Sequence, residues 1–193
     1  MPPKPVPVRL ESTDVELAWQ VAERRNAYRG YAKRYDRWGV GLLDETDPVL
    51  VGTLGEIAFA LWVRDETGLV VPLDDKDRPR GDRGRDFNLD GLWVQVKTGH
   101  NRYSDLLVRS TDFTDRTWNV CVRAHWPPRD DPDDKQTVWL CGWVRDRELR
   151  NKGKLEPARR GTHTNYALTD VEFNPMRDLA VLVRARRTLR GEP

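Results

Sequence analysis

Residues 84–97, GRDFNLDGLWVQVK, are the stretch of this chain that decides its fold. The dipeptide Asp90-Gly91 lies between two short runs in which apolar and polar residues alternate. This combination predicts a β-hairpin closed by a tight two-residue turn. Pairing of Leu89 with Leu92 across the turn then sets the register of the two strands.

In this register one face of the hairpin is polar and the other is apolar, because side chains alternate along a strand. Asp86 lies opposite Gln95, and Lys97 lies two residues further along the same face. The apolar face consists of Phe87, Leu89, Leu92, Val94 and Val96. A carboxylate, an amide oxygen and an ammonium group on one face suit a metal ion and a scissile phosphate. An ordinary amphipathic hairpin with a solvated polar face is the simpler interpretation.

A second segment, residues 49–63, VLVGTLGEIAFALWV, carries Glu56 as its single charge. Its periodicity predicts a helix that is apolar on nearly every side and therefore buried. A buried carboxylate needs an arginine, a raised pKa or a metal ion. Gly52 and Gly55 each weaken a helix by about 1 kcal/mol, so we expect a close approach there. A buried Glu–Arg pair stays open as the alternative to a metal.

The order of these motifs resembles the PD-(D/E)XK nuclease superfamily, whose members have the restriction-endonuclease-like fold. The chain has G-x-x-G-E on a helix, then R-D-F on a strand and Q-x-K on the next strand. Residues 137–149 and 166–179 resemble the C-terminal portion of small phage and bacterial members. The resemblance covers about residues 48–180 and implies an α/β fold with a mixed central sheet between helices.

The resemblance implies Mg²⁺-dependent hydrolysis of phosphodiester bonds in DNA, with Mn²⁺ as a substitute. Glu56, Asp86 and Gln95 correspond to the metal-binding positions, helped by the Val96 carbonyl, and Lys97 corresponds to the catalytic lysine. The family usually has Asp or Glu where this chain has Gln95. Because only two formal anions remain, we expect one Mg²⁺ rather than two. A catalytically inactive DNA-binding module and a protein-interaction protein on the same fold are the alternatives.

Basic and aromatic residues suggest where DNA would bind. A helix predicted over about residues 14–38 interleaves arginines with tyrosines, although a solvated face also explains this pattern. Residues 150–161 form a concentrated basic segment, predicted to be a loop. Trp93 either touches nucleic acid or packs under the N-terminal extension. The proposed nucleic-acid contacts are Trp93, Lys152, Lys154, Arg159, Arg160, Arg25 and Arg29.

The composition is that of an intracellular protein, with 33% charged residues and a net charge of +2. The sequence contains no apolar run of about 18 residues, so no membrane-spanning helix is expected. The Pro-rich start also lacks the apolar stretch of a signal peptide. We therefore expect a cytoplasmic location, DNA as the partner and no membrane association, and leave a homodimer open. Residues 1–47 are predicted to form a Pro-rich lead and a basic, aromatic helical extension, and residues 48–193 the nuclease-like domain. The two parts are expected to form one compact unit.

Further strands are expected near residues 69–71, 106–109, 118–124, 138–144 and 166–168, and a final helix over about residues 175–187. Cys121 and Cys141 are expected as free thiols, opposite one another in a hairpin centred near residue 131. A zinc site built from these cysteines with His125 and His163 is conceivable, but no closely spaced ligand pair supports it.

Overall fold

The computed structural model describes residues 1–28, 47–73, 85–100, 105–113, 119–127, 136–158 and 163–191. In these ranges the main sheet has five strands in the order β1-β6-β5-β3-β2. The strands are β1 (Val6–Arg9), β2 (Phe87–Leu89), β3 (Leu92–Gly99), β5 (Val120–His125) and β6 (Thr137–Arg145). β3 and β5 run parallel, whereas the other neighbouring pairs run antiparallel. The protein is thus an α/β protein with a mixed sheet, as predicted.

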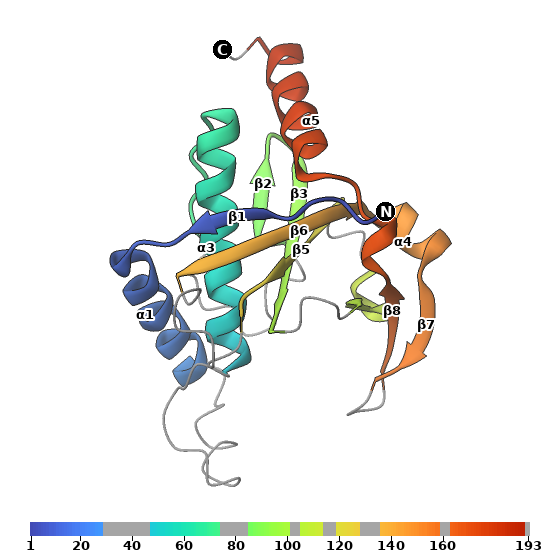
Figure 1. Ribbon diagram of the computed structural model, residues 1–193, viewed down its shortest axis with the longest axis horizontal. Helices are drawn as coiled ribbons and strands as arrows, with labels where there is room; N and C mark the ends of the chain where they lie inside the picture. Colours follow the sequence, from blue (N-terminus) through green and yellow to red (C-terminus); the bar gives the residue numbers. More distant parts are fainter. Residues whose placement is uncertain are drawn as a thin grey trace, which may run out of the picture.

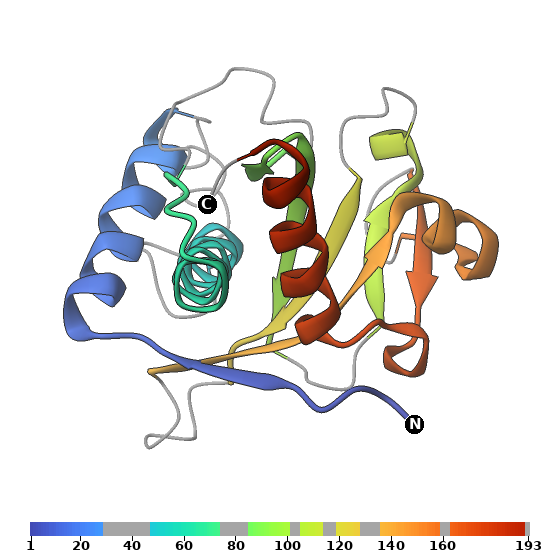
Figure 2. The same ribbon diagram turned by 90° about the horizontal axis from the view of Figure 1, so that it is seen from above.

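Helices cover one face of this sheet, and a second, smaller sheet covers the other (Figures 1 and 2). The helices are α1 (Ser12–Tyr28), α3 (Pro48–Thr67) and α5 (Met176–Leu189). The small sheet has the strand order β4-β8-β7 and is accompanied by α4 (Asp146–Lys152). Its strands are β4 (Leu106–Arg109), β7 (Lys154–Pro157) and β8 (Thr164–Leu168), with 3₁₀ turns η1 (Ser110–Phe113) and η2 (Asp170–Glu172). Parallel strands need a crossover connection, and the chain between β3 and β5 makes it through β4 and η1.

The two ends of α3 are fixed by local sequence. The Asp47 carboxylate accepts hydrogen bonds from the amides of Val49 (2.7 Å) and Leu50 (3.3 Å), and Pro48 occupies the first turn. At the other end Gly68 adopts φ 70° and donates its amide to the Arg64 carbonyl. A carboxylate cap, an early proline and a left-handed glycine are the standard signals of helix ends. The predicted helix is therefore present, and it begins one residue earlier and ends four residues later than predicted.

The β2–β3 hairpin has the predicted register, with Leu89 opposite Leu92 and Phe87 opposite Val94. Asp90 (φ 51°) and Gly91 (φ 81°) both have positive φ, as a two-residue turn of type I′ requires. The Asn88 side chain also accepts a hydrogen bond from the Gly91 amide at 2.7 Å. The hairpin is thus determined by its turn and by the alternation of its strands.

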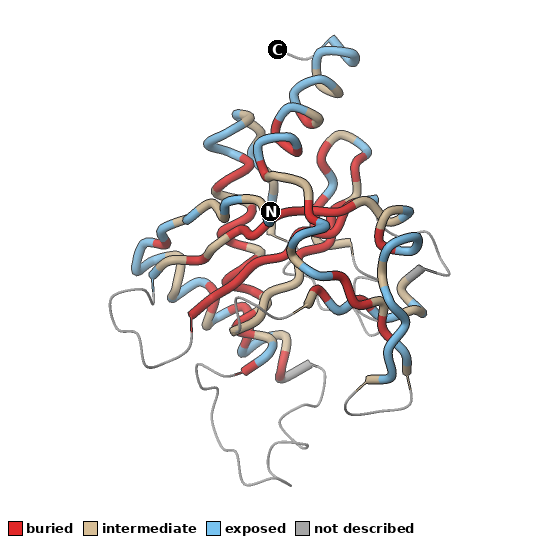
Figure 3. The backbone as a smooth tube through the Cα atoms, turned by 45° about the vertical axis from the view of Figure 1, so that its right-hand side comes forward, coloured by how far each residue is buried: buried red, intermediate tan, exposed pale blue. Residues whose placement is uncertain are grey.

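Both faces of the hairpin are covered. The apolar face predicted from the sequence lies in the main core, against α3 and α5. The polar face lies toward a second apolar cluster, made by Leu106, Val108, Cys121, Val144, Leu149, Leu168 and Phe173. In Figure 3 the central strands are largely buried, whereas β7, at the edge of the small sheet, is exposed. The polar face is therefore not fully solvated: Gln95 is buried, Asp86 and Lys97 are half-buried, and Asn88 is exposed.

The N-terminal residues are part of the packed unit. β1 pairs with β6 at the edge of the main sheet, where Pro7 lies opposite Trp139. An edge position suits proline, which has no amide hydrogen to donate to a neighbouring strand. Ala18 and Ala22 of α1 are buried in the main core. The segment predicted as an extended lead thus contributes a strand, and the part of the helix beyond Tyr28 lies outside the described residues.

Other predicted elements need correction. Residues 69–71 form no strand, and residues 150–158 contain the end of α4 and β7 rather than a loop. Cys121 lies opposite Val144 rather than Cys141, and the β5–β6 register shifts by one residue between Arg123 and Ala124. The remaining predicted strands and the final helix are present with slightly different ends. None of the helices in the described ranges combines the length and apolar character needed to cross a bilayer.

Candidate active site

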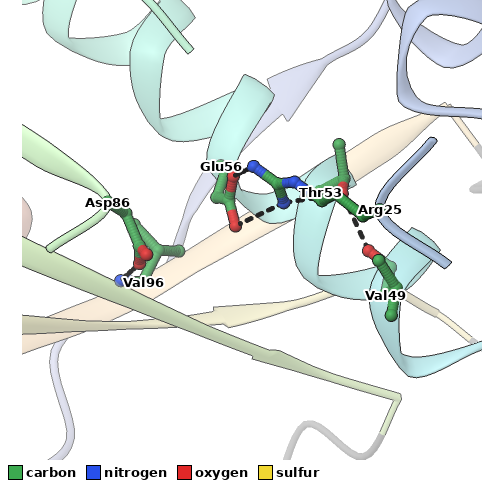
Figure 4. Close-up of polar contacts among 6 residues, drawn as sticks. All are labelled: Arg25, Val49, Thr53, Glu56, Asp86 and Val96. Carbon is green, nitrogen blue, oxygen red and sulfur yellow. Dashed lines mark hydrogen bonds and ion pairs between the residues drawn. The ribbon is translucent and has the colours of Figure 1, made fainter. Parts of the chain in front are cut away.

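Asp86 lies where β2 begins, at the edge of β3. Its amide donates to the Val94 carbonyl at 3.0 Å, and its carboxylate Oδ2 accepts from the Val96 amide at 2.5 Å (Figure 4). The Asp86 side chain thus accepts the hydrogen bond from the Val96 amide that a backbone carbonyl would accept if β2 were longer. Asp86 is half-buried, and its carboxylate is fixed beside the strand that carries Gln95 and Lys97.

Gln95 lies within β3, one residue beyond its pairing with β2 and opposite Cys121 of β5. The residue is only 2% exposed, and its Oε1 atom is buried without a hydrogen-bond partner among the described residues. A buried acceptor without a partner costs about 1–3 kcal/mol. Such a group invites a donor or a hard cation, for which an amide oxygen is a suitable ligand.

Lys97 is half-buried, two residues beyond Gln95 on the same face of β3. The pKa of the neighbouring Cys121 thiol depends on the charges around it. Burial raises its pKa to about 12, with the Lys97 ammonium opposing this rise and the Asp86 carboxylate adding to it. Asp86 and Lys97 therefore lie close enough to act on the thiol that pairs with Gln95. The structure brings these three predicted residues into one region.

The raised pKa of Cys121 predicts an unreactive thiol. In a Cys141→Ala variant, which leaves Cys121 as the single cysteine, we expect almost no native-state reaction with a thiol reagent at about pH 8, because the thiolate is the reactive form. Denaturation should release one reactive thiol per chain. Rapid labelling of the folded variant would show that Cys121 is accessible and ionised.

Arg123 and His125 join this region from β5. The sequence analysis missed Arg123 and considered His125 only as a ligand of the conceivable zinc site. Burial lowers the pKa of Arg123, which donates hydrogen bonds to the carbonyls of Lys97 (3.3 Å) and Ala124. His125 Nδ1 lies 3.2 Å from the Gly99 carbonyl. These contacts hold the end of β3 against β5. Cys121, Arg123 and His125 alternate along the sequence, and this pattern could have indicated that all three lie on one face of the strand. The segment was instead taken as an apolar strand as a whole.

Glu56 has an arginine partner. Arg25 of α1 donates from Nη1 to Oε1 at 3.1 Å and from Nη2 to Oε2 at 2.8 Å (Figure 4). The buried Glu–Arg pair, considered as an alternative to a metal, is therefore present. In the view of Figure 4, Glu56 lies between Arg25 and Asp86. A metal-binding role for Glu56 stays a prediction, and it requires this ion pair to open.

The expected close approach at the glycines of α3 occurs at Gly55. A Cβ atom there would lie 1.8 Å from Oγ1 of Thr98 on β3. Among the described residues, a Cβ atom at Gly52 would meet nothing within 4 Å. Gly55 therefore lets α3 approach β3 beside Glu56, whereas Gly52 has no such role.

Trp93 does not pack under the described part of the N-terminal extension. Its ring packs against the second apolar cluster, and the Arg85 guanidinium lies 5.0 Å from the ring centroid. The N-terminal strand β1 is at the opposite edge of the sheet, and residues 29–46 of the extension lie outside the described residues. Contact of Trp93 with nucleic acid stays a prediction.

The other proposed DNA contacts lie in different environments. Lys152 forms an ion pair with Glu172 at 2.9 Å, and that hydrogen bond raises the lysine pKa. Lys154 is exposed on β7. The Arg25 guanidinium is bound to Glu56. Arg29, Arg159 and Arg160 lie outside the described residues.

Within the described ranges, no three His, Cys, Asp or Glu side chains gather into a metal-binding group. The conceivable zinc site is therefore absent there, and both cysteines are buried free thiols. Any metal held near Asp86 would depend on neutral oxygen donors such as Gln95. Comparison with protein-family models, curated proteins and solved structures finds no match for this chain.

Proposed function

We propose that the protein is a Mg²⁺-dependent DNA nuclease of the restriction-endonuclease-like type. The observation that carries the proposal is the buried Gln95 Oε1 atom, which has no hydrogen-bond partner in the described part of the chain and lies on the strand that also binds the Asp86 carboxylate. Oxygen donors of this kind suit a hard divalent cation. The half-buried Lys97 on the same strand face adds a cation for the phosphate.

Each residue has a distinct proposed role. Asp86 and Gln95, with the Val96 carbonyl, would hold the ion, and Glu56 supplies the second carboxylate of the region. A bound Mg²⁺ polarises a phosphate oxygen and lowers the pKa of a water molecule. Lys97 orients the attacking water and neutralises charge that develops on the phosphoryl group. Arg123 holds the Lys97 backbone through the 3.3 Å hydrogen bond to its carbonyl.

The test is a cleavage assay on linear, circular, branched and single-stranded DNA, with Mg²⁺ and separately with Mn²⁺. We expect metal-dependent cleavage of at least one substrate by the wild type and its loss in Asp86→Asn. Circular dichroism of the variant controls for folding. Absence of cleavage on every substrate with both metals would remove the nuclease proposal.

A second function, DNA binding without hydrolysis, is favoured by two observations. Gln95 stands where an acidic ligand is expected, and both oxygens of Glu56 are bound to Arg25. Salt-sensitive DNA binding without cleavage would select this function. If neither binding nor cleavage is found, a protein-interaction role on the same fold becomes the better explanation.

Gln95→Glu tests the ligand role directly. The new carboxylate would be buried near Asp86, so we expect the metal-free variant to lose roughly 1–3 kcal/mol of stability at neutral pH. Mn²⁺ should stabilise the variant more than the wild type, and cleavage should be maintained or increased. Thermal unfolding with and without Mn²⁺ measures the first effect. A folded variant without any activity would mean that Gln95 acts as a hydrogen-bond donor instead.

A further inference from the structure

The ion pair between Arg25 and Glu56 links the N-terminal helix to the candidate site. Two roughly parallel hydrogen bonds, of 3.1 and 2.8 Å, join the guanidinium to both carboxylate oxygens. Nη1 of Arg25 also donates to the Thr53 hydroxyl at 3.1 Å. That hydroxyl in turn donates to the Val49 carbonyl at 2.8 Å, which orients its oxygen as an acceptor for Arg25. One guanidinium is therefore held by two side chains of α3.

This pair is shielded from water, with side-chain exposures of 16% for Arg25 and 12% for Glu56. A bidentate pair between arginine and a carboxylate is stronger than an ordinary surface ion pair. While the pair is closed, each oxygen of Glu56 shares its negative charge with Arg25 and has fewer acceptor sites left, so the carboxylate is a weaker ligand for a divalent cation. The positive guanidinium also repels a cation that approaches Glu56.

We propose that Arg25 is a latch on Glu56, which keeps this carboxylate from the metal until the guanidinium moves away. The inference rests on the proposed metal-dependent function and concerns the regulation of the same site. Ala18, Val21 and Ala22 anchor α1 by their burial, so the helix can stay in place when the Arg25 side chain moves. A DNA phosphate is a suitable competitor for the guanidinium, because arginine binds phosphate in the same bidentate way. The latch would thus couple the arrival of DNA to the binding of the metal.

The experiment measures Mn²⁺ affinity by calorimetry on the full chain, without DNA and without turnover. We expect Arg25→Gln to bind Mn²⁺ about tenfold to hundredfold more tightly than the wild type. This factor corresponds to the free energy of one charge-assisted hydrogen bond, which Mn²⁺ no longer has to compete with. Arg25→Lys should give an intermediate affinity, because a lysine keeps the charge but cannot span both oxygens. A residue that only supports the fold would not tighten metal binding.

Arg24→Gln is the matched control. Arg24 is the preceding residue of the same helix, is exposed, and donates from Nε to the Gln20 carbonyl at 3.3 Å. This substitution removes the same charge but leaves the contact with Glu56. We expect it to change Mn²⁺ affinity by less than about twofold, because exposed charges are screened by salt.

Mn²⁺ binding by Asp86→Asn distinguishes an error in the latch proposal from an error in the proposed metal site. If wild-type Mn²⁺ binding depends on Asp86 but Arg25→Gln binds no more tightly, the latch is wrong and the metal site stands. If neither the wild type nor Arg25→Gln binds Mn²⁺, or if both bind it equally well after Asp86→Asn is added, the metal site is wrong and the latch fails with it. Circular dichroism monitors folding, and if Arg25→Gln does not fold, the comparison of Arg25→Lys with wild type decides.

Discussion

Lys97→Ala should reduce single-turnover DNA cleavage at saturating DNA by about 10²- to 10³-fold, as expected for the loss of a group that acts on the transition state. The ammonium group is proposed to stabilise charge that appears only as the phosphodiester bond breaks. DNA affinity should fall only modestly, and the salt dependence of binding should decrease by about one unit, because one phosphate-facing cation is lost. Rapid-quench cleavage and salt-dependent binding measure the two effects.

Lys154→Ala is the control for this experiment. Lys154 is a proposed DNA contact that is exposed on β7, in the small sheet, and its loss removes the same charge outside the proposed catalytic residues. We expect cleavage at saturating DNA to remain within about twofold of wild type, since this residue has no role in the proposed chemistry. If Lys97→Ala cleaved as fast as wild type under these conditions, the proposed active site would be misplaced. DNA binding without hydrolysis would then be the better description.

Gly55→Ala should destabilise the protein by about 1–3 kcal/mol, although alanine is the better helix former. The added Cβ atom would lie 1.8 Å from Oγ1 and 2.9 Å from Cβ of Thr98, so α3 and β3 must move apart. The midpoint of thermal unfolding should fall by about 2–4 °C for each kcal/mol in a protein of this size. Glu56 follows Gly55 directly, so we also expect weaker metal-dependent activity.

Gly52→Ala is the matched control, one turn earlier in the same helix. Within the described part of the chain its Cβ atom would meet no atom within 4 Å. We therefore expect this variant to be more stable than wild type by up to about 1 kcal/mol. Urea unfolding measures the free energy of unfolding of both variants. If Gly52→Ala and Gly55→Ala changed it equally, the close approach of α3 to Thr98 would be contradicted.

The parts of the fold that follow from short-range patterns were predictable. The Asp90-Gly91 turn, which needs two residues with positive φ, and the alternation on both sides of it fixed the hairpin register. The apolar periodicity of residues 49–63 predicted a buried helix, and its end signals lie just outside that range. These features depend on residues close together in the chain, so the sequence alone contains the information.

The candidate site was predictable only in part. Asp86, Gln95 and Lys97 were placed on neighbouring strands by the hairpin register, and the structure keeps them in one region. Arg123 escaped notice because its strand was taken as apolar. Its position beside Lys97 depends on the parallel pairing of β3 with β5, which no local pattern specifies.

The sequence by itself determined the hairpin, the buried helix and the polar row that begins at Asp86. Tertiary structure alone decided what surrounds them. The small sheet covers the polar face of β3, so that Gln95 is buried rather than solvated. The partner of Glu56 is Arg25, which is 31 residues away in the chain and belongs to a different helix. Turns, alternation and helix periodicity are set by neighbouring residues, whereas the choice of partner for a buried charge depends on how distant segments pack.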